Sequence, residues 1–303
     1  MSRAALRLSV CAMFANVIIG VDGGRGGRDA IALAAALAPA DAHVTLAHIY
    51  GASAPAPAGA RPHPRSAADA LDLLAAARDA SGIDAELATA SASSVARGLH
   101  VLSERHGADL LVVGSHTRAG AGHIPAGDDT GASLSGAPCA VAVAPHGYEP
   151  RFGGFLRIGV AYDFSPESEA ALAVARVLAQ RDGAKLRACH VVGVPVWGYV
   201  APMPVGWGEL VEADREAARE RVATLEGVDA TAVHGLPREE LAAFGARVDL
   251  LVVGSRNRGP LRRLIAGSTS HALARRASCA LLIVPRTAAC AGAQVSTSLR
   301  SSA

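Results

Sequence analysis

The sequence predicts two tandem α/β domains, each a doubly wound, five-stranded parallel sheet flanked by helices. The motif Asp-Leu-Leu-Val-Val-Gly-Ser at residues 109–115 recurs letter for letter at residues 249–255, about 140 residues later, which indicates a duplicated unit. Within each copy, short continuous apolar runs alternate with segments of helical spacing. Strands of that kind are buried on both faces, and in this alternating order they form parallel sheets covered by helices.

In the first half, apolar runs predict strands at residues 16–21, 41–50, 84–90, 109–113 and 139–144. Apolar residues at helical spacing predict helices at residues 28–37, 67–80 and 93–106, with a short helix between the last two strands. The stretch 51–65 is rich in Pro, Ala and Gly and has no apolar period, so we expect a loop there.

The second half repeats this pattern. Strands are expected at residues 157–162, 185–192, 228–234, 249–253 and 279–284, and helices at residues 166–180, 209–225, 237–244 and 271–276. We therefore expect domain 1 at residues 16–146 and domain 2 at residues 155–286. Residues 1–15 are expected to be an N-terminal extension, and the polar tail 287–303 is expected to be disordered.

The composition is that of a compact globular protein: 50% of the 303 residues are hydrophobic and 18% are charged. A net charge of +2 gives no reason to expect nucleic-acid binding. No apolar run approaches the roughly 18 residues of a membrane span, so we expect a soluble, cytoplasmic protein. The five cysteines form no Cys-x-x-Cys pair, and Cys139 and Cys279 are expected to pack in the core as reduced thiols.

The loop after the fourth strand of the second half has the residues of a phosphate site. It begins at Gly254 and ends at Gly267-Ser268-Thr269, before the helix expected at 271–276. Glycines allow close backbone approach, and hydroxyls with unpaired N–H groups at a helix N-terminus suit a phosphate. The structural alternative is that Gly254 turns the chain and Ser268 caps the helix, and the loop alone leaves both open.

This part of the chain resembles the universal stress proteins. Nucleotide-binding members of that family carry Gly, two residues, Gly, nine residues and then Gly-Ser or Gly-Thr; the second half has Gly254, two residues, Asn257, nine residues and Gly267-Ser268. The strand ending in Val-Ala-Tyr-Asp-Phe-Ser at residues 160–165 is also similar, and the resemblance covers residues 15–286. It implies an adenine nucleotide alpha hydrolase-like fold.

In ATP-binding relatives, the Asp after the first strand lies by the ribose and adenine, the end of the second strand lines the base, and the Gly-rich loop holds the phosphates. The resemblance therefore implies an ATP site, with or without Mg²⁺, at Ala161, Tyr162, Asp163, Val191, Gly254, Arg256, Asn257, Gly267, Ser268 and Thr269. Asn257 departs from the family's second Gly. Asn tolerates a positive φ better than other non-glycine residues, but its side chain could crowd the phosphates.

The first half carries a degenerate counterpart of this motif, at Asp22, Gly114, Thr117 and Gly127. A β-branched Thr replaces the second Gly, and Asp128 replaces the hydroxyl residue at the helix start. A carboxylate caps a helix well but repels a phosphate at the same place. We therefore expect that domain 1 has lost triphosphate binding.

Three functions are compatible with these residues. The first is a regulatory, ATP-binding universal stress protein that answers to stress or energy state through a protein partner not yet known. The second is a nucleotide-free interaction module of the same family. The third, an enzyme such as a slow ATPase, has least support because no Gly-x-x-x-x-Gly-Lys-Ser/Thr motif is present.

The histidines and the final strands carry two further expectations. His43, His48, His190 and His234 lie on or beside strands and are expected to be hydrogen-bonded rather than to act as ligands or bases. Single-domain relatives pair their final strands in a dimer, so the resemblance implies an internal pseudo-dimer, with residues 139–144 against 279–284. Further dimerisation of the tandem chain is left open.

Overall fold

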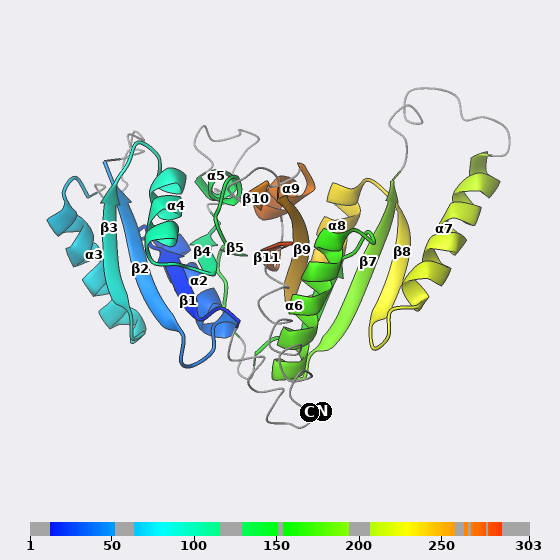
Figure 1. Ribbon diagram of the computed structural model, residues 1–303, viewed down its shortest axis with the longest axis horizontal. Helices are drawn as coiled ribbons and strands as arrows, with labels where there is room; N and C mark the ends of the chain where they lie inside the picture. The colour runs from blue at the N-terminus through cyan, green and yellow to red at the C-terminus, as the bar shows by residue number, and fades with distance from the viewer. Residues whose placement is uncertain are drawn as a thin grey trace, which may run out of the picture.

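The computed structural model describes residues 13–51, 64–115, 129–150, 154–193, 207–257, 264–265, 268–276 and 278–286. Both halves of the chain are α/β units, and the mostly parallel sheet with helices on its two faces has the predicted fold class (Figure 1).

In domain 1, the strands are β1 (Asn16–Gly20), β2 (His43–Tyr50), β3 (Glu86–Ser91), β4 (Leu110–Gly114) and β5 (Ala140–Ala144). The helices are α2 (Arg25–Leu37), α3 (Ala67–Ser81), α4 (Val95–Arg105) and α5 (Asp129–Leu134). Helix α2 begins three residues earlier than predicted, because the Gly-rich segment at its start carries few apolar residues and gives no helical period.

In domain 2, the strands are β6 (Arg157–Ala161), β7 (Lys185–Gly193), β8 (Asp229–Gly235), β9 (Leu250–Asn257), β10 (Leu264–Ile265) and β11 (Ala280–Pro285). The helices are α6 (Pro166–Asp182), α7 (Trp207–Ala223), α8 (Pro237–Gly245) and α9 (Ser268–Arg276).

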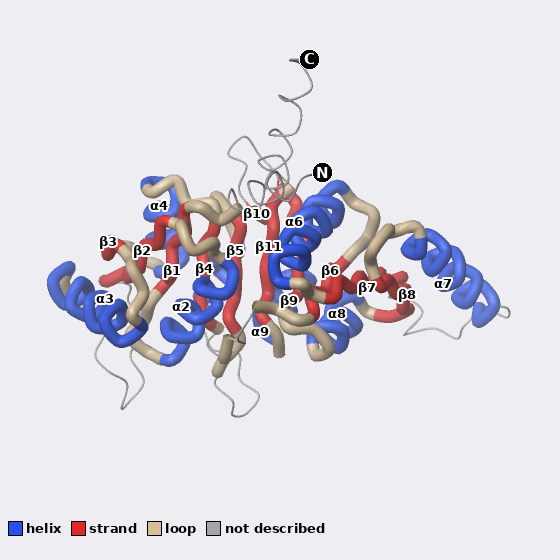
Figure 2. Tube along the Cα trace, turned by 90° about the horizontal axis from the view of Figure 1, so that it is seen from below, coloured by secondary structure: helices blue, strands red, loops and turns tan. Residues whose placement is uncertain are grey.

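One sheet runs through the whole molecule in the order β3-β2-β1-β4-β5-β11-β9-β6-β7-β8. Within each half the strands on this path are parallel, and the two halves meet where β5 pairs antiparallel with β11, with Ala142 opposite Leu282. Figure 2 shows these two strands side by side at the centre of the row. The expected pairing of the two final strands is confirmed. It gives each strand a second partner, so that neither β5 nor β11 is an open edge of the sheet.

Each face of the sheet has an apolar core that continues across the two domains. Helices α2, α3 and α6 cover one face with residues such as Leu33, Leu74 and Leu172. Helices α4, α5, α8 and α9 cover the other face, where Cys139, Cys189 and Cys279 are buried. Burial raises the pKa of Cys139 and Cys279 to about 12 and that of Cys189 to about 11, so these thiols are core residues, as expected for Cys139 and Cys279.

The repeated Asp of the duplicated motif has a structural role in both halves. The carboxylate of Asp109 accepts hydrogen bonds from the backbone N–H groups of Ala15 (2.8 Å) and Asn16 (3.2 Å). Asp249 does the same for Leu156 (3.1 Å) and Arg157 (2.9 Å). Each Asp therefore ties the start of its domain's first strand to the neighbouring fourth strand.

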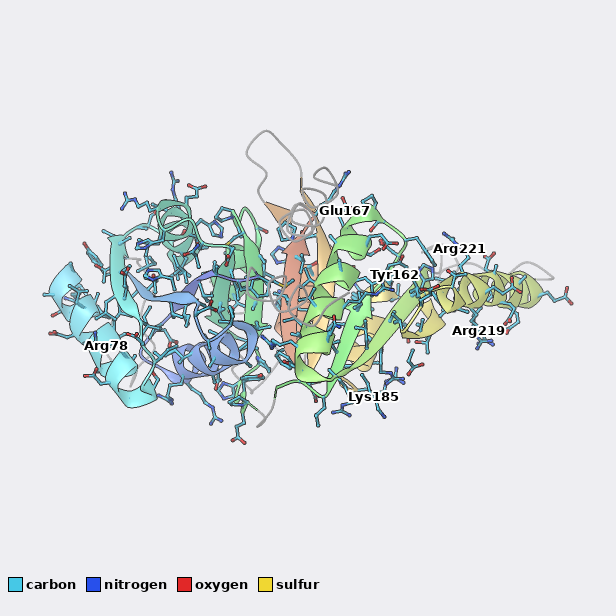
Figure 3. All side chains as sticks on the ribbon, turned by 60° about the horizontal axis from the view of Figure 1, so that its bottom comes forward. Arg78, Tyr162, Glu167, Lys185, Arg219 and Arg221 are labelled. Carbon is cyan, nitrogen blue, oxygen red and sulfur yellow. The ribbon has the colours of Figure 1, made fainter. Side chains whose placement is uncertain are left out.

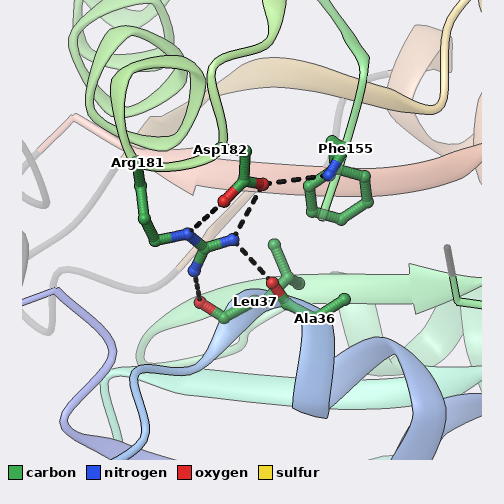
Figure 4. Close-up of polar contacts among 5 residues, drawn as sticks. All are labelled: Ala36, Leu37, Phe155, Arg181 and Asp182. Carbon is green, nitrogen blue, oxygen red and sulfur yellow. Dashed lines mark hydrogen bonds and ion pairs between the residues drawn. The ribbon is translucent and has the colours of Figure 1, made fainter. Parts of the chain in front are cut away.

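Among the described residues, polar contacts join the domains at two places away from the sheet. Arg181, at the end of α6, donates hydrogen bonds to the carbonyls of Leu37 (2.8 Å) and Ala36 (2.6 Å) at the end of α2, and it forms an ion pair with Asp182, which accepts from the N–H of Phe155 (Figure 4). On the other face, Ser135 Oγ and His271 Nε2 are hydrogen-bonded at 2.8 Å. They lie beside α5 and on α9, which lie next to one another over the seam (Figure 1).

Two details of domain 2 differ from the prediction. Residues 254–257 do not form a loop; they continue β9. Gly254 and Ser255 pair in parallel with β11. Arg256 and Asn257 pair antiparallel with Ile265 and Leu264 of β10. Helix α9 begins at Ser268 rather than at residue 271. A two-residue strand gives too short a pattern to be recognised, and the polar run Ser-Thr-Ser has no apolar period from which a helix could be predicted.

Candidate functional site

The candidate site of each domain lies where the strand order reverses. The first strand of each domain, β1 or β6, lies between the second and the fourth strand, and the crevice beyond the carboxyl ends at such a reversal is the usual ligand site of doubly wound sheets. Asp22 follows β1 and Asp163 follows β6 at this point.

The two aspartates make different contacts. Asp22 Oδ1 accepts hydrogen bonds from the N–H groups of Gly24 (2.8 Å) and Gly27 (2.9 Å), and so it satisfies a donor in the first turn of α2. In domain 2 this task belongs to Ser165, whose hydroxyl accepts from the N–H of Ser168 (3.2 Å) at the start of α6. Asp163 is therefore not needed as a helix cap.

Asp163 is exposed and ionised at neutral pH. Burial raises its pKa, but hydrogen bonds from the hydroxyl and N–H of Ser165 outweigh this effect, so the pKa of Asp163 lies below its ordinary value. An ionised carboxylate is an acceptor only. Asp163 is thus suited to accept hydrogen bonds from hydroxyl groups of a ligand at this edge.

The second strand of each domain is fixed to the same edge by a histidine. His48 Nδ1 donates to the carbonyl of Val21 (2.6 Å), and His190 Nδ1 donates to the carbonyl of Tyr162 (2.8 Å). These two histidines are hydrogen-bonded, as expected. Val191 follows His190 in β7 and is partly buried, opposite Val233 of β8.

Gly254 is required by packing. A Cβ atom on Gly254 would overlap the backbone carbonyl of Glu167 in the first turn of α6, and a Cβ on Gly114 would overlap the backbone of Gly26 in α2. The helix after the first strand therefore crosses each fourth strand too closely for any side chain. This packing accounts for the glycine in both domains, whether or not a ligand is bound.

The remaining residues of the domain 2 motif lie between β9 and α9. Arg256 and Asn257 end β9, and Ser268 and Thr269 open α9, a helix of nine residues. Because Asn257 belongs to a paired strand, the structure does not place it in the left-handed turn that we considered for this residue. Gly267 lies outside the described residues, as do Thr117, Gly127 and Asp128 of domain 1.

An aromatic cluster at the domain 2 edge was not predicted. Phe164 has φ +61, and its ring lies edge-on to Tyr162 (5.0 Å between centroids) and His190 (5.1 Å), with the Arg221 guanidinium 3.9 Å from its centroid. Figure 3 shows Tyr162 and Arg221 on this side of domain 2. Burial and a hydrogen bond to Glu169 raise the pKa of Tyr162 to about 12.

A signal for this cluster was present in the internal repeat. Gly23 (φ +74) is the counterpart of Phe164 in domain 1, since each follows the aspartate after the first strand. One copy has a glycine at this position and the other has an aromatic residue. The volume occupied by the side chain therefore differs between the two domains here.

The described residues hold neither a metal-binding cluster nor a membrane-spanning helix. Within these ranges, no group of three or more His, Cys, Asp or Glu is placed to hold a metal ion. In the same part of the chain, no helix is both long enough and apolar enough to cross a membrane.

Known proteins resemble this chain at the level of each half and of the whole. The profile of the universal stress protein family (Usp) matches residues 13–145 and again residues 154–285. A Thermus aquaticus protein named "Universal stress protein in QAH/OAS sulfhydrylase 3'region" is 33% identical over 145 residues, which are 43% of this chain and 98% of that protein.

Two solved structures share the fold of the complete tandem. One, of a putative universal stress protein from Pseudomonas aeruginosa UCBPP-PA14, has a TM-score of 0.61 and 16% identity, covering 95% of this chain and 99% of its own. Another, of a universal stress protein from Archaeoglobus fulgidus DSM 4304, has a TM-score of 0.58 and 18% identity, covering 91% and 98%. With the family profile matching both halves, the chain belongs to the universal stress protein family, as a tandem of two domains.

Proposed function

We propose that this protein is a regulatory protein that binds one ATP molecule, in domain 2, and that its stress response depends on this site. The observation that supports the proposal is the difference in helix capping. Ser165 satisfies the first turn of α6, so Asp163 remains an exposed, ionised acceptor at the carboxyl end of β6. In domain 1, Asp22 itself accepts a hydrogen bond from the first turn of α2.

The other contacts follow from the elements at this edge. Asp163 would accept hydrogen bonds from the ribose hydroxyls, and the end of β7 at Val191 would line the base, beside Ala161 and Tyr162. The N-terminus of α9, with Ser268 and Thr269, would hold the phosphates through backbone N–H groups and the helix dipole. Gly254, Arg256, Asn257 and Gly267 would border the phosphates, and Mg²⁺ would enter together with the phosphates.

In domain 1 the sequence at the corresponding helix start is unfavourable for a phosphate. Its helix α5 has six residues, and the sequence places Asp128 and Asp129 at its start, where carboxylates repel a phosphate. We therefore propose that each chain binds one ATP. The proposal includes no hydrolysis of that ATP.

The test is calorimetric titration of the intact chain with ATP. We expect one site in the wild type, loss of binding in Gly267→Val, and at least tenfold weaker binding in Asp163→Ala. Asp22→Ala is the matched control and should bind ATP as the wild type does. Asp128→Ser should raise the stoichiometry if the carboxylate is what excludes ATP from domain 1.

Two results would count against this function. If Gly267→Val binds ATP normally, the nucleotide does not lie at the domain 2 loop. If the wild type binds none, the nucleotide-free interaction module becomes the better account.

A further inference from the structure

A large cavity lies in domain 1. It has a volume of about 1070 Å³ and extends from the carboxyl ends of β1, β2 and β4 into the groove between α2 and α3. Cavities of roughly 300–1,000 Å³ with mainly apolar walls are typical of small-molecule sites. Its apolar walls include Ile31, Leu73, Ala77 and Ile83 along the groove, and Leu99 and Val113 nearer the strand ends.

The groove is open because residue 23 is glycine. A Cβ atom at Gly23 would lie 2.8 Å from Leu73 Cδ1, so any side chain at this position would point into the groove, toward α3. Domain 2 shows the result: Phe164, with the same left-handed backbone, packs against the cluster that contains Ala218 and Val222 of α7. The two domains therefore differ in whether this space is filled.

The polar groups at the end of the cavity near the sheet are unsuited to a phosphate. The N–H groups of Gly24 and Gly27, at the helix N-terminus nearest the cavity, already donate to the carboxylate of Asp22. Among the described lining residues, Arg28 is the one arginine or lysine, and the carboxylate of Asp22 is close to it in sequence. A highly charged anion in this cavity would be attracted by Arg28, repelled by Asp22 and otherwise surrounded by apolar walls.

An uncharged ligand fits these surroundings better. The apolar walls stabilise a hydrocarbon or aromatic body by burial. Asp22 and His48, which line the end of the cavity near the sheet, offer polar partners for one hydrogen-bonding group, since a carboxylate oxygen can accept more than one hydrogen bond.

We propose that domain 1 binds an uncharged small molecule with an apolar ring body, in the groove between α2 and α3, independently of the nucleotide in domain 2. The body lies against Leu73 and Ala77, and a donor group of the ligand reaches Asp22. The proposal extends the function of the protein to a second ligand class, and it does not require ATP to bind in domain 2.

A pair of fluorescent probes tests the ligand class. N-phenyl-1-naphthylamine is neutral, whereas 1-anilinonaphthalene-8-sulfonate has a related aromatic body and a negative charge. We expect the neutral probe to bind the wild-type chain with a stoichiometry of one and the sulfonate to bind at least tenfold more weakly. Equal affinities, or no binding of the neutral probe, would overturn the proposal.

Substitutions test the location. Gly23→Phe, which copies Phe164, should weaken binding of the neutral probe at least tenfold, and Ala77→Trp, which fills the groove from α3, should do the same. Gly183→Phe is the matched control: Gly183 has φ +68 and no atom within 4 Å of a Cβ, so the same change occurs at a similar backbone but outside the groove. Its probe affinity should equal that of the wild type.

Competition with ATP separates this site from the nucleotide site. Saturating ATP should leave the probe's affinity unchanged within twofold. Displacement of the probe by ATP would show that the cavity is itself a nucleotide site, and unchanged probe binding in both Gly23→Phe and Ala77→Trp would show that the probe lies elsewhere. Either result would overturn the proposal.

Discussion

The two domains have the same backbone fold, but they differ in the side chain that lies in the space beside the first strand. Domain 1 has Gly23 and an open cavity of about 1070 Å³, whereas in domain 2 Phe164 packs on Tyr162, His190 and Arg221. Both positions have a positive φ, which glycine adopts freely and a bulky residue adopts at a cost. Both copies thus keep the same turn, but only Phe164 places a side chain in the space beside it.

The same comparison holds for the neighbouring aspartates. Asp22 accepts hydrogen bonds from the start of α2, while Ser165 does this for α6 and leaves Asp163 exposed. Domain 1 has Gly24 where domain 2 has Ser165, and this difference accompanies the change of helix-capping residue from Asp22 to Ser165. The predictions below examine where the two copies are equivalent and where they are not.

The largest effect is expected where the copies are equivalent. Gly254→Ala and Gly114→Ala each place a Cβ onto helix backbone, at Glu167 and Gly26 respectively. Because backbone cannot rotate away as a side chain can, we expect each change to lower the free energy of unfolding by about 3 kcal/mol or more. Urea denaturation measures the loss.

Gly208→Ala is the control for this pair. Gly208 lies in α7 with no atom within 4 Å of a Cβ, so Ala should be neutral or stabilising by about 0.5–1 kcal/mol. If Gly254→Ala were as stable as Gly208→Ala, this would contradict the close approach of α6 to β9 at Gly254.

The contact between the domains should give the next largest effect. Arg181 donates to two carbonyls of α2 and pairs with Asp182, so Arg181→Ala should cost about 1–3 kcal/mol. Arg176, also on α6, is exposed and donates to the carbonyl of Glu226 within its own domain, and Arg176→Ala should stay within about 0.5 kcal/mol of the wild type. If both variants lost the same free energy of unfolding, the contacts of Arg181 with α2 would not contribute to stability.

The capping residues should show a smaller, asymmetric effect. Asp22→Ala and Ser165→Ala each remove the acceptor for a first-turn N–H group and should cost about 1 kcal/mol. Asp163→Ala removes the acceptor for the hydroxyl and N–H of Ser165 but leaves the Ser165 cap itself, so it should cost less than Asp22→Ala. Thermal unfolding of the three variants tests this order, and an Asp163→Ala variant as unstable as Asp22→Ala would contradict it.

The repeated aspartates of the duplicated motif should respond to acid in opposite directions. Burial raises the pKa of Asp109 above its ordinary value, despite hydrogen bonds from Asn16 and Ala15. At Asp249, burial acts the same way, but hydrogen bonds and the charge of Arg157 outweigh it and the pKa is lowered. Asp249 therefore adds stability that is present above its unfolded pKa and is lost as the pH falls through its folded pKa. Asp109 favours the folded state at acid pH and loses this contribution as the pH rises.

Denaturation between about pH 5 and pH 2 measures these contributions. Asp249→Asn should lose less stability on acidification than the wild type, and Asp109→Asn should lose more. The same slope in both variants would show that the two aspartates are equivalent after all.

Much of the fold could be predicted because its signals are local and repeated. The apolar strand runs and the letter-for-letter motif at residues 109–115 and 249–255 indicate parallel, buried strands in two copies. The strand pair β9–β10 could not be predicted, because β10 has two residues and its partner residues Arg256 and Asn257 carry no strand pattern.

The candidate site was predicted only in part. The family's motif indicates Asp163 and the loop from Gly254 to Thr269, but it does not show that Gly254 is required by the crossing of α6. Nor does it show that Ser165 takes over the cap or that Gly23 opens a cavity toward Leu73. These features depend on contacts between segments far apart in the chain, for which one sequence gives no direct signal.

The most direct test of the difference between the domains is a count of bound nucleotide. The protein would be purified without added nucleotide, denatured, and the released adenine nucleotide identified by mass spectrometry and counted by absorbance, before and after saturation with ATP and removal of the excess. The account predicts one ATP per chain after saturation. Two per chain would contradict the loss of the domain 1 site, and none would contradict the site in domain 2.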